Sequence, residues 1–198
     1  GGSHQMLEDI ALMRALPNMT VIVPADGIEA AAAVKAAAEY KGPVYIRLGR
    51  SKVETIFDEN YKFRIGKGTV VKEGTDVTLF ACGIMVETAL KAAEILASDG
   101  INAAVVNLST IKPLDTALIV KMAEETKAAV TCEEHTILGG LGSAVAEVLV
   151  ENCPIPMERV GVEDKFGQSG LPDELLKAYG LTAEKIAEKA KAAIARKA

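Results

Sequence analysis

The sequence lacks an apolar run near the roughly 18 residues that a helix needs to cross a bilayer, and no basic-then-apolar leader opens it. We therefore expect neither membrane insertion nor secretion, and we predict a cytoplasmic protein. Blocks of Lys and Arg are also missing, because the 22 basic residues are interleaved with 27 acidic residues, for a net charge of -5. Nucleic acid is not expected as a partner, since binding to phosphates needs clustered positive charge.

Cysteine is scarce as well, with only Cys82, Cys132 and Cys153 in the 198 residues. Their odd number and apolar neighbours argue against a disulfide framework. We expect buried, reduced thiols without a redox or metal role.

Strand-like and helix-like runs alternate along the chain, and neither internal repeats nor low-complexity segments interrupt them. The composition, with 49% hydrophobic, 25% charged and 4% aromatic residues, suits a soluble chain that buries one large or two small cores. The alternation predicts an α/β fold with helices packed on a mostly parallel sheet. The expected strands are 20–23, 44–48, 68–72, 77–81, 103–108, 128–133 and 157–161, and the expected helices are 7–16, 28–40, 86–97, 114–125, 143–150, 173–179 and 183–196.

The periodicity disappears between residues 49 and 62, where Ser, Lys, Glu, Asp and Asn dominate. Such a composition indicates an extended linker. We therefore predict part of one parallel-sheet α/β domain in residues 1–48 and a second α/β domain, with a mostly parallel five-stranded sheet, in residues 63–198.

Glycines at 139, 140 and 142 follow an expected strand and precede an expected helix, where a backbone can approach a phosphate. Val145 stands where a dinucleotide-binding turn needs Gly or Ala, and no P-loop Lys follows. These features favour a tight strand-to-helix turn over a phosphate site.

Glu133-Glu134-His135 precedes that turn and could suggest a metal site or an acid and base pair. Adjacent strand residues point to opposite faces, and no second His lies within ligand spacing. We expect His135 to be structural and hydrogen-bonded across the sheet edge. The polar loop from Asp164 to Gly170 is likewise expected to be structural.

Four segments in order resemble the transketolase family. Ser3-His4-Gln5 followed by Pro17-Asn18-Met19-Thr20-Val21 resembles its pyrimidine-binding domain, and the other three segments resemble its C-terminal domain. Those three are Thr110-Ile111-Lys112-Pro113-Leu114-Asp115, Glu133-Glu134-His135 with the glycine turn, and Phe166-Gly167-Gln168-Ser169-Gly170 with Tyr179-Gly180-Leu181. The resemblance extends across the whole chain.

The resemblance implies transfer of a two-carbon ketol unit between sugar phosphates, with thiamine diphosphate and Mg²⁺ or Ca²⁺ at sites on a dimer interface. By the same resemblance, His4 would be catalytic and hydrogen-bond substrate hydroxyls, while Arg50 would bind the substrate phosphate. The run Gly2-Ser3-His4 also resembles the remnant of a cleaved tag, but Gln5 and the residues after it favour native sequence.

The family's activating Glu and its pyrophosphate and metal ligands have no counterpart here, and no Gly-Asp-Gly run occurs. We expect the cofactor-binding residues upstream of residue 1, no metal ligand in this chain, and an N-terminal transketolase half or subunit as partner. The chain alone is expected to bind the cofactor weakly or not at all and to be inactive.

Two alternatives remain open from the sequence. One is a fragment of a neighbouring thiamine-diphosphate family, either deoxyxylulose-phosphate synthase or the β subunit of a 2-oxo acid dehydrogenase. The other is a non-catalytic module, in which residues 63–198 serve dimer packing.

Overall fold

A five-stranded sheet with the strand order β3-β5-β4-β7-β8 organises the larger part of the chain. The structure is a computed structural model that describes residues 2–197. The edge strand β3 runs antiparallel to β5, whereas every other neighbouring pair of this sheet is parallel. This arrangement confirms the expected α/β fold with a mostly parallel five-stranded sheet. The strands are β3 (Thr69–Lys72), β4 (Val77–Ala81), β5 (Ala103–Asn107), β7 (Ala129–Thr136) and β8 (Met157–Val162).

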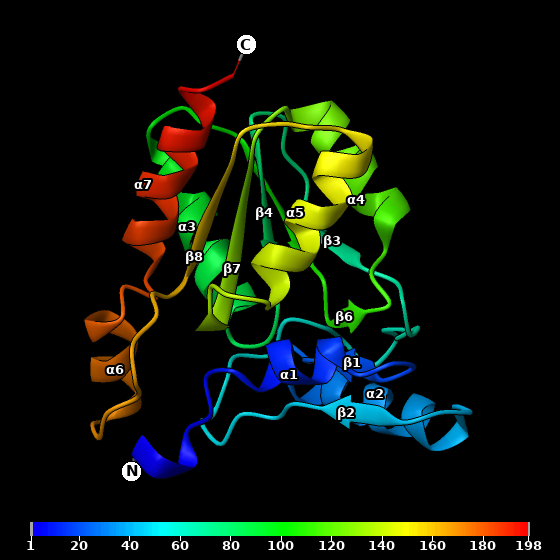
Figure 1. The fold of residues 1–198 in the computed structure, drawn as a ribbon. Coiled ribbons are helices and arrows are strands. Elements are labelled where there is room, and N and C mark those ends of the chain that lie inside the picture. Colours follow the sequence, from blue (N-terminus) through cyan, green and yellow to red (C-terminus); the bar gives the residue numbers. More distant parts are fainter. Residues whose placement is uncertain (1, 198) are drawn as a thin grey trace.

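Helices cover both faces of this sheet (Figure 1). One face carries α3 (Met85–Ser98) and α7 (Ala183–Ile194), and the other carries α4 (Thr116–Thr126) and α5 (Leu141–Asn152). Every residue of β4 and β5 is buried, as expected for central strands covered on both sides.

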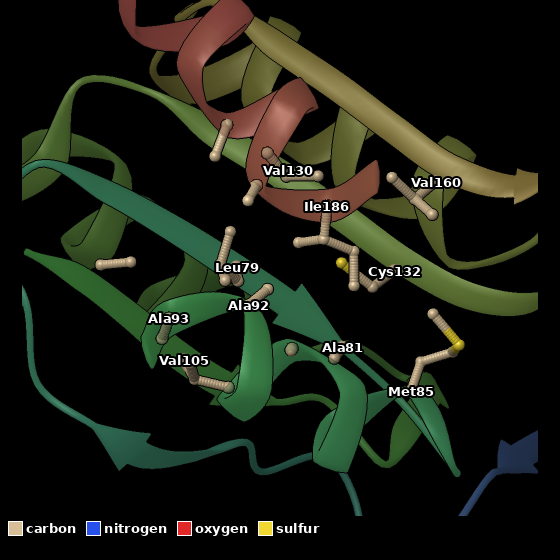
Figure 2. Packing of buried hydrophobic residues seen from close by; sticks show 14 of the residues in the cluster. Leu79, Ala81, Met85, Ala92, Ala93, Val105, Val130, Cys132, Val160 and Ile186 are labelled. Atoms are coloured by element: carbon tan, nitrogen blue, oxygen red, sulfur yellow. The ribbon is translucent and has the colours of Figure 1, made fainter. Parts of the chain in front are cut away.

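The two hydrophobic cores lie on opposite faces because successive strand residues alternate in direction. Leu79 packs into the core under α3 and α7, and its neighbour Phe80 packs into the core under α4 and α5. Figure 2 shows Leu79 close to Ala92 of α3 and Ile186 of α7. The alanines of α3 and α7 that face the sheet are fully buried, and their small side chains let the helices lie close to it; they are Ala89, Ala92, Ala93, Ala190 and Ala193.

The smaller part of the chain contains two parallel strands, β1 (Thr20–Ile22) and β2 (Val44–Ile46), beside the larger sheet (Figure 1). Its helices are α1 (Asp9–Ala15) and α2 (Gly27–Glu39), and a 3₁₀ turn covers Gly2–His4. Helix α6 (Pro172–Ala178) follows a loop that contacts the N-terminal segment, where Gly2 N donates to Ser169 Oγ (3.3 Å).

A short strand that the sequence did not indicate joins the two parts. Strand β6 (Thr110–Lys112) pairs antiparallel with β1 and completes a three-stranded sheet of order β2-β1-β6. Its three residues are too few for a periodic signal, and its pairing partner is remote in sequence. The resemblance had singled out Thr110 to Asp115 without assigning a strand to them.

Residues 47–68 form neither helix nor strand, but two buried carboxylates of the smaller part bind them, and one of these also reaches the larger sheet. Asp26 Oδ2 accepts hydrogen bonds from the backbone N–H groups of Ile56 (2.8 Å) and Phe57 (2.9 Å). Glu29 Oε1 accepts from the Tyr61 hydroxyl (2.7 Å) and from Asn107 Nδ2 of β5 (2.9 Å). The division into domains at 1–48, 49–62 and 63–198 stays a prediction.

Side chains cap two of the helices, since Asp26 Oδ1 accepts from Glu29 N (2.8 Å) at the start of α2 and Thr182 Oγ1 accepts from Lys185 N (3.3 Å) at the start of α7. The three thiols are free; two are buried, as expected, whereas Cys153 is half-buried. No helix within residues 2–197 is long and apolar enough to span a membrane.

Candidate functional site

A cleft of about 880 Å³ opens between the N-terminal segment and the loop after β8. Its walls come from residues 2, 4–8, 11 and 12 on one side and from residues 136, 138 and 164–167 on the other. The cleft therefore lies where the smaller part meets the larger sheet.

His4 is exposed and lines this cleft at the end of the 3₁₀ turn. The walls are largely apolar, because Met6, Leu12 and Leu138 are each about half exposed and Phe166 is fully exposed. An accessible imidazole beside apolar walls can exchange hydrogen bonds with a hydroxylated ligand.

Arg50 is exposed in the segment after β2 and is not among the residues that line the cleft. The structure therefore places the two predicted site residues on the same part of the chain without bringing them into one described cleft.

Arg47, three residues earlier, lies at a junction that the sequence did not reveal. Its guanidinium donates to Asp9 Oδ2 (Nε, 3.0 Å), to Glu134 Oε2 (Nη1, 3.2 Å) and to the carbonyl oxygen of Met6 (Nη2, 3.3 Å). Burial opposes the charge, but the carboxylates of Asp9 and Glu134 raise the pKa of Arg47 above its ordinary value. The guanidinium thus stays charged.

Asp9 is buried at the start of α1 and also accepts from the Tyr45 hydroxyl (2.8 Å). Burial and this contact with a carboxylate raise the pKa of Tyr45 to about 12, so its proton remains in the hydrogen bond. Local sequence gives no sign of these partners, because Asp9 and Arg47 come from elements separated by β1 and α2.

Glu133 explains the glycine turn. Its carboxylate is buried and accepts from the backbone N–H groups of Leu141 (2.7 Å) and Gly142 (2.8 Å), the first residues of α5. A carboxyl group of the protein itself therefore occupies the helix N-terminus, where a phosphate would otherwise bind. The tight strand-to-helix turn is confirmed.

His135 is fully buried, and its structural role is confirmed. Its Nε2 accepts from the backbone N–H of Ala11 in α1 (3.3 Å), and its Nδ1 lies 2.7 Å from the Thr136 carbonyl oxygen. Nε2 can accept only without a proton, so Nδ1 carries the proton and donates it. The expected bond across the sheet edge is wrong, because β7 continues to Thr136 and the ring faces a helix of the smaller part.

Among residues 2–197, the side chains offer no ligand set for a divalent cation, and the glycine turn is not open to a phosphate. Within residues 2–197 there is no group of three or more His, Cys, Asp or Glu side chains that could hold a metal ion. The glycine turn that might receive a phosphate already holds the carboxylate of Glu133. The cofactor that the resemblance implies therefore has no matching set of metal ligands among residues 2–197.

Family models match both parts of the chain. The model described as "Transketolase, pyrimidine binding domain" matches residues 1–55, and the model described as "Transketolase, C-terminal domain" matches residues 66–186.

Curated relatives include the "6-deoxy-6-sulfo-D-fructose transketolase subunit SqwH" of Clostridium sp. (strain MSTE9), with 48% identity over 100% of this chain and 61% of that protein. A "Putative transketolase C-terminal section" of Methanocaldococcus jannaschii is 48% identical over 96% of this chain and 60% of that protein. A "1-deoxy-D-xylulose-5-phosphate synthase" of Heliobacterium modesticaldum is 40% identical over 96% of this chain and 30% of that protein.

Among solved structures, "Split gene transketolase, inactive beta4 tetramer" matches with a TM-score of 0.97 and 54% identity, over 100% of this chain and 65% of that chain. A transketolase mutant from Pichia stipitis matches with a TM-score of 0.78 and 25% identity, over 98% of this chain and 28% of that chain. The chain thus spans about three fifths of the length of the first two curated relatives.

Proposed function

The chain belongs to the transketolase family, and we propose that it is the C-terminal portion or subunit of a thiamine-diphosphate-dependent transketolase that transfers a two-carbon ketol unit between sugar phosphates. The support is the adjacent matches to the pyrimidine-binding and C-terminal domain models, at residues 1–55 and 66–186. Two relatives at 48% identity are named as a transketolase subunit and a transketolase C-terminal section.

In this proposal, an N-terminal half or subunit holds thiamine diphosphate and Mg²⁺ or Ca²⁺, and the assembly is a cytoplasmic homodimer of such pairs. The cofactor supplies the carbanion chemistry when bound. One solved structure, 54% identical in sequence to this chain, is named as an "inactive beta4 tetramer" of a split gene transketolase. The inactivity of that protein supports the expectation that this chain needs a partner for activity.

The imidazole of His4 is exposed and lines a cleft of about 880 Å³. This observation supports a role for the chain's own residues in binding the sugar. There His4 exchanges hydrogen bonds with the hydroxyls of the sugar and stabilises negative charge that develops on oxygen. Arg50, exposed after β2, binds the phosphate group through its planar guanidinium.

Calorimetric titration tests the proposal: thiamine diphosphate with Mg²⁺ is titrated into this chain, into an N-terminal transketolase half, and into their mixture. We expect saturable binding only in the mixture. An assay of the sugar products should likewise detect glycolaldehyde transfer only there. Saturable binding to this chain alone would overturn the partner requirement, and absence of transfer in a correctly assembled mixture would overturn the transketolase activity.

The 40% identity to a 1-deoxy-D-xylulose-5-phosphate synthase over 96% of this chain favours a second candidate, the synthase reaction on the same residues. Analysis of products separates the two, because the synthase would form 1-deoxy-D-xylulose 5-phosphate and no transferred ketol unit. If neither product forms, but removal of residues 63–198 abolishes assembly of the partner, the chain is a packing module.

A further inference from the structure

The last three residues of β7 contact different points between Met6 and Ala11, Glu134 through Arg47 and the other two directly. Glu134 binds Arg47, which donates to the Met6 carbonyl oxygen (3.3 Å). His135 accepts from Ala11 N (3.3 Å), and the backbone N–H of Thr136 donates to the Leu7 carbonyl oxygen (2.7 Å). The larger sheet thus contacts the smaller part directly beside the cleft.

The segment from Gln5 to Glu8 forms no helix or strand. Its position is therefore not determined by a repeating backbone hydrogen-bond pattern, and each anchored carbonyl restricts its conformations directly. Met6 and Leu7, whose carbonyls are anchored, stand two and three residues after His4. Loss of an anchor should consequently broaden the positions that the imidazole samples.

The guanidinium of Arg47 hydrogen-bonds to three different segments of the chain. Its three nitrogens reach α1 through Asp9, the larger sheet through Glu134, and the N-terminal segment through Met6. The N–H donors of a planar guanidinium point at fixed angles and can serve such divergent acceptors, whereas a Lys ammonium is a single point. The side chain is largely buried, at 19% exposure, so it does not lie free in the cleft.

We propose that Arg47, held in place by Glu134, is a positioning residue for His4, and that the C-terminal domain takes part in sugar binding through this pair. The inference rests on the proposed function for its effect on catalysis, but not for its effect on the order of the segment. Neither Arg47 nor Glu134 needs to touch the substrate.

Hydrogen exchange on the full chain, read by mass spectrometry, tests the positioning without any activity. We expect peptides covering residues 4–12 to exchange several-fold faster in Arg47→Met and in the milder Glu134→Gln variant, with peptides of β4 and β5 unchanged. Arg47→Lys should fall between Arg47→Met and the unsubstituted chain.

A matched control is Glu147→Gln, because Glu147 also pairs with an arginine, Arg14, at 2.8 Å across the junction of the two parts. It lies on α5, outside the cleft that holds His4. This variant should leave the exchange of residues 4–12 unchanged. The combined Arg47→Met and Glu134→Gln variant should match Arg47→Met alone if the two residues act as one unit.

In the active mixture with an N-terminal half, Glu134→Gln should raise the KM for the donor sugar phosphate several-fold and change kcat less. Unchanged exchange of residues 4–12 in both single variants would overturn the inference, as would an equal acceleration throughout the sheet. If the mixture shows no transfer in any variant, the proposed function fails, while the exchange data still decide the positioning role.

Discussion

Gly140 lies so close to the side chain of Glu133 that a Cβ atom at position 140 would overlap the carboxylate oxygen Oε2. The same atom would stand 2.6 Å from Nδ1 of the buried His135. The glycine is therefore required by the buried carboxylate at the start of α5 and not by a bound phosphate.

The first prediction is that Gly140→Ala lowers the free energy of unfolding by about 1–3 kcal/mol, the usual cost of overpacking a core. Gly27→Ala is the matched control, because a Cβ at Gly27 meets nothing within 4 Å. It should be neutral or stabilise the chain by about 0.4–1 kcal/mol. Urea unfolding monitored by circular dichroism measures both, and an equal response of the two variants would contradict this account of the turn.

The second prediction concerns pH. Burial raises the pKa of Glu133 to about 7, although its contacts with the N–H groups of Gly142 and Leu141 oppose the shift. Between pH 4.5 and 7 the folded chain therefore binds a proton that the unfolded chain has released. The contribution to stability is complete below pH 4.5 and falls as pH rises through 7, by up to about 3 kcal/mol.

Urea unfolding at a series of pH values checks this second prediction. Glu133→Gln cannot titrate, so the difference in unfolding free energy between it and the unsubstituted chain should change in this pH range. A difference that is independent of pH would show that Glu133 is already ionised at pH 4.5 in the folded chain.

The third prediction uses Arg50. In the active mixture, Arg50→Ala should raise the KM for a phosphorylated sugar about 10–100-fold, because a charge-assisted hydrogen bond is worth about 1.5–3 kcal/mol. The KM for the same sugar without its phosphate should not change. Lys52→Ala, which removes a nearby exposed charge, should stay within about two-fold, a limit set by the small effect of screened surface charges. Equal effects on both sugars would remove Arg50 from phosphate binding.

The sequence predicted the elements well because most of them carry either a continuous apolar run or an amphipathic period. The strand at 77–81 has the predicted bounds, whereas β7 runs three residues beyond the expected end at 133. That extension brings Glu134 and His135 into the strand, where alternation sends their side chains to different partners.

The features that the sequence did not predict are contacts between segments that are remote in sequence. Strand β6 exists through its pairing with β1, and Arg47 is defined by Asp9 and Glu134, which no local pattern links to it. The resemblance instead drew attention to Arg50, whose exposed position the structure shows but whose phosphate role stays a prediction.

The last prediction separates two tasks of Asp26, which caps α2 through Oδ1 and fixes residues 56 and 57 through Oδ2. Asp26→Ser keeps a good N-cap but removes the second oxygen, whereas Asp26→Ala removes both. Each lost hydrogen bond to the charged oxygen should cost up to about 1.5–3 kcal/mol, because water replaces only part of it at this half-buried segment. Limited proteolysis should therefore cut near Phe57 faster in both variants, with the helix signal reduced more in Asp26→Ala. Unchanged cleavage in Asp26→Ser would mean that Phe57 and its stacked neighbour Tyr61, 3.9 Å away between ring centroids, hold the segment without the carboxylate.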